Sequence, residues 1–212
     1  MKVAVAYEPN TPLVLEDLPE PEVGARDVRV RIAASGICHT DLNVIEGRSA
    51  LALPIVPGHE ACGTVEAVGD EVRRVKTGDR VLASVSPACG SCWWCTNGMS
   101  NHCERGPIVQ QTKRFTLADG RQAGAVCGCG SFAEVMVVDE ASVVAVQTDL
   151  ADEQLALLRE GDHAGRRARA LGVRDDLRLA AFEDGDRGVR RAEVDADDLA
   201  HADPSRPKRA LL

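Results

Sequence analysis

The sequence is poor in aromatic residues and has no long apolar segment. Phe, Trp and Tyr make up 3% of its 212 residues. No uninterrupted apolar run reaches the roughly 18–20 residues that a membrane-spanning helix needs. The apolar residues 3–7 are too few for a secretory signal, and they end at Glu8 and Pro9. These absences predict a soluble, cytoplasmic protein with no membrane partner.

An excess of basic residues is also absent. The formal net charge is -8 and the sequence pI is about 5.2. Because binding to nucleic acid phosphates needs a basic surface, no nucleic-acid partner is expected. The length and the 44% hydrophobic content suffice for one well-formed core, or for one domain and part of a second.

Cysteine is absent from the end of the chain. All eight cysteines lie at or before Cys129, and residues 159–212 also lack Ile, Thr, Asn, Tyr and Trp. This tail shows no period of 2 or 3.6, and it is rich in Arg, Asp, Ala, Leu and Gly. We expect residues 151–212 to be a short helix over 151–158, capped by Asp149 or Asp152, followed by an irregular or disordered segment.

Residues 1–150 have the pattern of a β domain. Short alternating or β-branched runs are separated by Gly and Pro, which is typical of a barrel-like β domain with few helices. One helix is expected from about Thr40 to Ile45. The predicted strands include residues 28–32, 63–69, 80–83, 133–138 and 143–146.

Four cysteines are spaced as metal ligands. The pattern is Cys89-x2-Cys92-x2-Cys95-x7-Cys103, and two-residue gaps let a tight turn direct successive thiolates at one point. Zinc takes four such ligands at about 2.3 Å in closed sites whose role is structural. The sequence therefore predicts a structural zinc. Trp93 and Trp94, inside this loop, are expected to shield the site or to pack on a neighbour.

A second group contains Cys38-His39-Thr40-Asp41 and, further on, Gly58-His59-Glu60. The run Gly58-His59-Glu60-x2-Gly63-x5-Gly69-x2-Val72 matches the signature of the zinc-containing alcohol dehydrogenases of the medium-chain dehydrogenase/reductase superfamily. With the four-cysteine loop, residues 1–158 resemble that family. The segment between Cys103 and Ser131 resembles its class III and nicotinoprotein-like branch.

The resemblance implies a GroES-like catalytic domain over 1–150, a mainly β (α+β) fold and two zinc ions per chain. It implies oxidation of a small alcohol to an aldehyde or ketone with NAD(P), usually in a homo-oligomer. The cofactor would carry the hydride while the protein supplies position and electrostatics.

The family's zinc ligands can be carried over to matching positions. Cys38 and His59 match two ligands of the catalytic zinc, and Glu60 matches the acidic neighbour that approaches the metal when ligands exchange. Asp41 matches the carboxylate that orients the histidine, a contact that fixes the tautomer of the imidazole.

Three further positions match residues of the family site. Thr40 matches the hydroxyl that passes the alcohol proton outwards. His39 stands where family members place a group near the cofactor phosphate. Val85 matches a residue of the pocket wall.

Two parts of the family pattern are missing. The third catalytic ligand is usually a cysteine in Leu-Leu-Gly-Cys-Gly, but this chain reads Leu157-Leu158-Arg159-Glu160-Gly161. No Gly-x-Gly-x-x-Gly loop follows, so the Rossmann domain that binds the nucleotide is not expected. Glu160 could replace the cysteine, since carboxylates bind zinc; the tail could be natural and dispensable; or, as we favour, a frameshift follows Leu158.

Three functions are therefore considered. The first is an enzyme of the alcohol dehydrogenase family, although turnover by this chain alone is doubtful. The second is a non-catalytic zinc-binding β domain, and the third is a GroES-like structural protein, against which the zinc motifs argue. The remaining cysteines are not expected to bind metal. Cys62 is expected to pack in the apolar interior, and Cys127-x-Cys129 to form an exposed glycine-rich turn.

Overall fold

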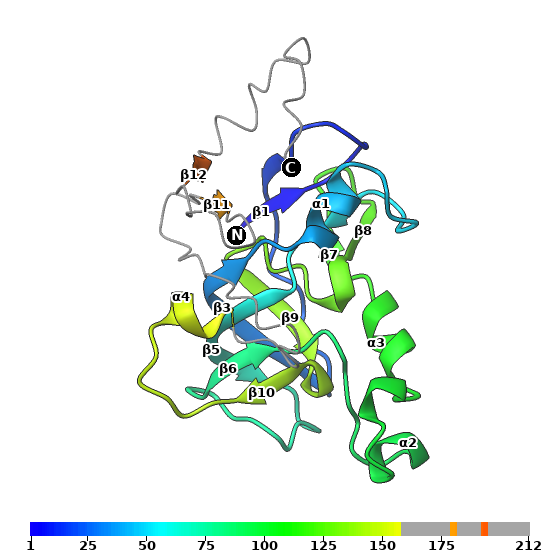
Figure 1. Ribbon diagram of the computed structural model, residues 1–212, viewed down its shortest axis with the longest axis vertical. Helices are drawn as coiled ribbons and strands as arrows, with labels where there is room; N and C mark the ends of the chain where they lie inside the picture. The colour runs from blue at the N-terminus through cyan, green and yellow to red at the C-terminus, as the bar shows by residue number, and fades with distance from the viewer. Residues whose placement is uncertain (158–178, 182–191, 195–212) are drawn as a thin grey trace, which may run out of the picture.

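The computed structural model describes residues 1–157, 179–181 and 192–194. They form a mainly β structure in which short helices lie at the ends of strands (Figure 1). This confirms the predicted fold class. No helix in the described part of the chain is long and apolar enough to cross a membrane.

The largest sheet has five antiparallel strands in the order β10-β6-β5-β3-β9. Each predicted strand appears in it, with ends that differ by a few residues. The longest pairing joins β3 to β5, in which Val28 faces Val68 and Gly36 faces Glu60. The strand bounds are β3 Asp27–Gly36, β5 Glu60–Val68, β6 Arg80–Ala83, β9 Val135–Asp139 and β10 Val143–Ala145.

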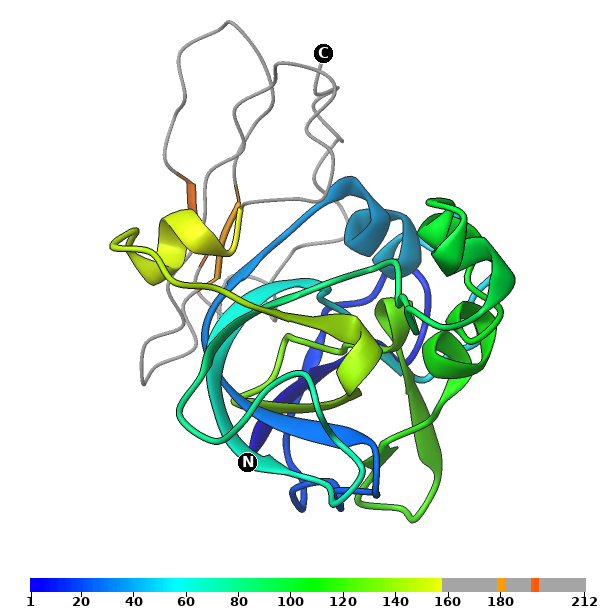
Figure 2. The same ribbon diagram turned by 90° about the horizontal axis from the view of Figure 1, so that it is seen from below.

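Two smaller sheets continue this one into a partly closed barrel (Figure 2). A bridge between Val3 and Ala133 joins the N-terminal hairpin to the chain just before β9, and a bridge between Ala6 and Ile55 joins that hairpin to the three-stranded sheet. The hairpin pairs β1 Lys2–Val5 with β2 Val14–Asp17, and the three-stranded sheet has the order β4-β8-β7, with β4 Ile55–Val56, β7 Phe115–Thr116 and β8 Gln122–Ala125.

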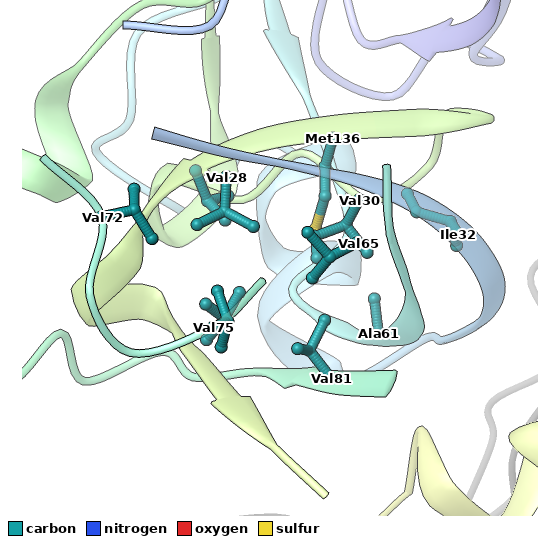
Figure 3. Packing of buried hydrophobic residues seen from close by; sticks show 11 residues of the cluster. Val28, Val30, Ile32, Ala61, Val65, Val72, Val75, Val81 and Met136 are labelled. Carbon is teal, nitrogen blue, oxygen red and sulfur yellow. The ribbon is translucent and has the colours of Figure 1, made fainter. Parts of the chain in front are cut away.

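The main core lies on the inner face of the five-stranded sheet. Alternate residues of β3 point inward, so Val28 and Val30 pack with Val65, Val81 and Met136, all at most 1% exposed (Figure 3). A second cluster surrounds Phe115 under the N-terminal hairpin. Burial of these aliphatic side chains is the main stabilising term of the domain.

The glycines of the Gly-His-Glu signature allow segments of backbone to approach closely. A Cβ at Gly63 would lie 2.1 Å from the Arg31 carbonyl oxygen on β3, and a Cβ at Gly69 would lie 2.1 Å from the Gly24 carbonyl oxygen. No other residue type fits at either position without moving the strands apart. These two glycines are therefore needed for the close packing of backbone segments rather than for a reaction.

The helices are short. The predicted helix near Thr40 is α1, and the one near residue 151 is α4, whose N-cap is Ala151 rather than Asp149 or Asp152. Asp152 instead pairs with Arg80. The bounds are α1 His39–Ile45, α2 Trp93–Thr96, α3 Gly106–Gln111 and α4 Asp152–Leu155, with 3-10 turns η1 Ser100–His102, η2 Val126–Gly128 and η3 Glu140–Ser142.

Little of the tail lies within the described residues. Two three-residue strands, β11 Leu179–Ala181 and β12 Ala192–Val194, pair antiparallel. The prediction of an irregular segment for the rest, and the boundary at residue 150, remain predictions.

Replacing Gly63 by alanine tests the close approach of β3 and β5. Gly63→Ala should lower the free energy of unfolding by roughly 1–3 kcal/mol or more, because the new methyl group meets a strand carbonyl. Gly106→Ala is the matched control, since its Cβ would be 4.0 Å from the nearest atom, a Pro87 oxygen, and should change stability by less than about 0.5 kcal/mol. Chemical denaturation measures both, and equal effects would refute the explanation.

Candidate metal centres

The four cysteines of the loop gather around one point. In the lobe that carries α2 and projects from the sheet (Figure 1), the sulfur atoms of Cys89, Cys92, Cys95 and Cys103 all lie within 4.8 Å of one another. All four are free thiols rather than disulfides. Such a set fits one tetrahedral zinc ion with every position filled by protein, as in structural sites.

Backbone amides point at these sulfurs. Amides of Ser91 and Cys92 donate to the Cys89 sulfur at 3.4 and 3.3 Å, and the Cys89 amide donates to the Cys103 sulfur at 3.3 Å. Hydrogen bonds from the Ser91 hydroxyl, and then from the Ser91 and Cys92 amides, lower the pKa of the Cys89 thiol to about 5. Because the thiolate is the form that binds metal, these hydrogen bonds favour binding of a metal cation by the loop.

A buried acidic pair holds this loop against the sheet. Asp139, at the end of β9, accepts from Arg105 at 2.7 Å, two residues after the last cysteine. Neighbouring Glu140 accepts from Arg26 at 2.8 Å and from the Arg73 amide at 2.8 Å. Both acidic residues are at most 5% exposed. Sequence reasoning missed this pair, although two adjacent acids after an apolar strand could have signalled it.

The two tryptophans of the loop are partly exposed and contact each other. Trp93 is 59% exposed and meets Trp94 edge to face, with ring centroids 4.9 Å apart. Trp94 also lies 5.2 Å from the His102 ring. Of the two expected roles, packing on a neighbour is confirmed by these ring contacts, and shielding of the site remains a prediction.

A second set of ligand atoms lies at the junction of α1 and β5. Atoms of Cys38, His59 and Glu60 lie within 4.8 Å of one another, and the Cys38 sulfur is 3.0 Å from His59 Nε2. Both donor atoms therefore face the same point. Thiolate, imidazole and carboxylate are all zinc ligands, and three protein ligands with an open position are typical of catalytic sites.

The Asp41 carboxylate joins the two segments that carry these ligands. Its Oδ1 accepts from the Gly58 amide at 2.8 Å and lies 3.2 Å from His59 Nδ1, while its Oδ2 accepts from the Cys38 amide at 3.1 Å. The contact to Nδ1 leaves Nε2 free to bind a metal. The carboxylate is 0% exposed, and it also closes the capping box that starts α1 at Cys38.

Hydrogen bonding sets the charge state of the pair. Burial disfavours the charged forms, but the hydrogen bonds to Asp41 and Cys38 outweigh it and raise the pKa of His59 to about 11. For Cys38, burial is likewise outweighed by hydrogen bonds from His59 and the Thr40 amide, and the thiol pKa is lowered. Both shifts favour the charged pair of a Cys38 thiolate and a His59 imidazolium, and metal binding at His59 would release the imidazolium proton.

The other predicted site residues lie at the surface. His39 and Thr40 are the first two residues of α1 and both are exposed. Val85 is 37% exposed, and its carbonyl accepts from Gln110 at 2.8 Å. The roles inferred for these three positions remain predictions. Glu160, the alternative third ligand, lies outside the described residues.

The remaining cysteines differ from one another. Cys62 is fully buried against Leu155, which confirms its packing role, and its thiol also donates to the Asp152 carbonyl at 3.1 Å. The expected exposed turn at 127–129 is wrong, since Cys129 is 1% exposed and Cys127 is half-buried. The left-handed backbone of Cys127 and Gly128 folds the turn inward.

One family model covers most of the described domain. It is the alcohol dehydrogenase GroES-like domain, which matches residues 24–148. A second model, described as NAD-specific glutamate dehydrogenase, matches residues 132–201. That second match covers less than half of the chain and overlaps the first over β9 and β10, so it defines no further family.

Individual relatives agree with the first model. The chain is 39% identical over 151 residues to an S-(hydroxymethyl)glutathione dehydrogenase of Saccharomyces cerevisiae, covering 68% of this chain and 39% of that protein. It is 36% identical to an alcohol dehydrogenase class-3 of Drosophila melanogaster, covering 77% of this chain and 45% of that protein. The chain thus spans about half or less of these relatives' length.

Solved structures give the same result. A benzyl alcohol dehydrogenase from Acinetobacter calcoaceticus superposes with a TM-score of 0.63 at 28% identity, over 73% of this chain and 43% of that one. An alcohol dehydrogenase zinc-binding domain protein from Burkholderia ambifaria superposes with a TM-score of 0.64 at 31% identity, over 73% and 44%.

Replacing Asp41 by asparagine tests its control of the second metal site. Asp41→Asn should weaken zinc binding at Cys38 and His59 by about 10- to 100-fold, since the imidazole loses its charged partner. Competition against a chromophoric chelator measures the affinity, and the four-cysteine site serves as an internal reference. Asp70→Asn, at an exposed position, is the control. Unchanged affinity in Asp41→Asn would show that the carboxylate only supports the fold.

Proposed function

Because the chain belongs to the family of zinc-containing alcohol dehydrogenases with a GroES-like domain, we propose that this domain binds and activates the alcohol in an NAD(P)-dependent dehydrogenase. The substrate is a small alcohol, and the product is the aldehyde or ketone. The observation that carries the proposal is the convergence of Cys38, His59 and Glu60 on one point, with Asp41 behind the histidine.

The donor set suits a zinc ion that works as a Lewis acid. When bound, zinc polarises an alcohol oxygen and lowers the pKa of its hydroxyl. Cys38 and His59 would hold the ion, and the contact of Asp41 with Nδ1 leaves Nε2 available as the ligand atom. Glu60, at 8% exposure, lies close enough to exchange with another ligand.

A proton must leave the alcohol before hydride transfer, and the group proposed to pass it outward is Thr40. In support of this, its amide donates to the Cys38 sulfur at 3.2 Å and the residue is exposed. His39 is exposed at the same end of α1, where it would meet a cofactor phosphate.

The hydride acceptor must come from NAD(P), and a nucleotide-binding loop is not found in the sequence. The described residues therefore supply the alcohol half of the reaction, and turnover requires a nucleotide-binding partner domain. A frameshift after Leu158 remains our interpretation of the tail. The second candidate function, a zinc-binding β domain without turnover, rests on this missing loop.

A chimaera separates the two candidates. Residues 1–157 joined to the nucleotide domain of the Acinetobacter benzyl alcohol dehydrogenase should form NADH from NAD⁺ and benzyl alcohol, as followed by absorbance. Cys38→Ser in the chimaera should reduce kcat by at least about 100-fold, because ligand loss removes the Lewis acid. Cys62→Ser should keep most of the activity, since Cys62 packs against Leu155 and is not one of the ligand atoms.

The contrary outcome is equally specific. A chimaera that folds, binds NAD⁺ and holds zinc at both sites, yet forms no NADH from any primary alcohol, would favour the non-catalytic zinc-binding domain.

A further inference from the structure

The turn η3 and its cap Asp139 contact both ends of the four-cysteine loop. On the entry side, the Ala88 amide donates to the Ala141 carbonyl at 3.2 Å, one residue before the first cysteine. On the exit side, Arg105 Nη2 donates to Asp139 Oδ2 at 2.7 Å, two residues after the last cysteine. One short turn at the end of β9 therefore binds the chain on both sides of the ligand set.

The two ends of the loop must stay next to each other for the ligands to meet. Cys89 and Cys103 are 14 positions apart, yet the Cys89 amide donates to the Cys103 sulfur at 3.3 Å. Cys103 is 4% exposed, whereas the other three cysteines are of intermediate exposure. A displacement of the exit segment would therefore move the most enclosed of the four ligands.

Asp139 uses its two oxygens for different partners. Its Oδ1 accepts from the Ala141 amide at 2.9 Å and so caps η3, while its Oδ2 accepts from Arg105. Since the Asp139 side chain is 7% exposed, loss of its charge would leave the Arg105 guanidinium without this buried anionic partner. Arg105 is also the N-cap residue of α3, so the ion pair lies where the loop ends and the next helix begins.

Glu140, the next residue, is buried to the same extent but binds elsewhere. It is 4% exposed and accepts from Arg26 at 2.8 Å. It also accepts from the amides of Arg73 and Arg74 at 2.8 and 3.3 Å. These partners precede the four-cysteine loop in the chain, in the segments before β3 and between β5 and β6. Of the two adjacent acids, Asp139 is therefore the one that binds the exit of the loop.

We propose that Asp139 is a positioning residue for the four-cysteine metal site. Through Arg105 it keeps the exit of the loop beside the entry, so that Cys103 meets the other three sulfurs and the loop retains its metal. This role depends neither on the second metal site nor on the proposed reaction. Because coupling between two sites is reciprocal, metal in the loop also stabilises η3.

The first test measures how fast the loop releases zinc. All samples carry Cys38→Ser, which removes a ligand of the second site, and an excess of a chromophoric chelator reports the released zinc by absorbance. Asp139→Asn should speed release by at least about tenfold, because Oδ1 still caps η3 while the charge that binds Arg105 is lost. Arg105→Gln should have the same effect, and the double variant should release zinc no faster than either single variant.

Glu140→Gln is the matched control. It should lower the midpoint of chemical denaturation, as Asp139→Asn does, yet leave the rate of zinc release unchanged. Arg105→Lys should retain most of the slow release, since it keeps the positive charge. The Arg105 side chain is 39% exposed, so Arg105→Gln tests the same contact with little change to the core. Unchanged release in Asp139→Asn and Arg105→Gln, or equally fast release in Glu140→Gln, would overturn the proposal.

The second test leaves the ion pair intact and reads the coupling in the other direction. Hydrogen exchange of the Cys38→Ser chain is compared with zinc in the loop and after its removal. Loss of zinc should speed exchange in the peptides that contain the Ala88 and Ala141 amides, more than in the hairpin of β1 and β2. Exchange at these two amides that does not respond to zinc, or that rises only as much as in the hairpin, would contradict the reciprocal coupling and with it the role of Asp139.

Discussion

The Asp41 carboxylate is the contact on which the second metal site depends. It is fully buried, and its two oxygens bind the Cys38 amide, the Gly58 amide and the His59 ring. Cys38 and His59 are 21 positions apart in the sequence; the pairing of Gly36 with Glu60 brings their segments together, and the Asp41 contacts fix their donor atoms. A buried carboxylate is stable only when its oxygens accept hydrogen bonds, and here the backbone amides beside the metal ligands donate them.

The two metal centres depend on the same sheet. His59 and Glu60 stand at the start of β5, whose pairing with β3 is the longest in the fold. The four-cysteine loop is tied to the end of β9 through Arg105 and Asp139. Structural zinc contributes roughly 10–16 kcal/mol of apparent binding free energy in finger peptides. Loss of metal from the loop would therefore also weaken the contact between Arg105 and the buried carboxylate of Asp139.

The sequence predicted the strands and ligand sets because both depend on local pattern. Alternation in β3 and the spacing of Cys89 to Cys103 are visible within short windows. The placement of Cys62 in the apolar interior followed from its neighbours in the same way. The resemblance to a known family added Asp41, whose contact to His59 is present in the structure.

What could not be predicted depends on distant parts of the chain. The sequence predicted an exposed glycine-rich turn at Cys127, but this turn packs against α3 and against apolar side chains of the core. The acidic residues Asp139 and Glu140 were not singled out in the sequence, because the arginines and amides that bind them come from three other segments. The cap of α4 was misassigned because Asp152 is used by Arg80 instead.

X-ray absorption at the zinc edge of the chain loaded with two zinc ions tests the central claim, that one centre is all sulfur and the other mixed. A sulfur shell at about 2.3 Å is expected together with a nitrogen or oxygen shell at about 2.0–2.1 Å, and the lighter shell should be lost in His59→Ala when the chain retains a single zinc. A spectrum with sulfur neighbours alone in the wild-type chain would contradict the account, because it would mean that Cys38 and His59 hold no metal.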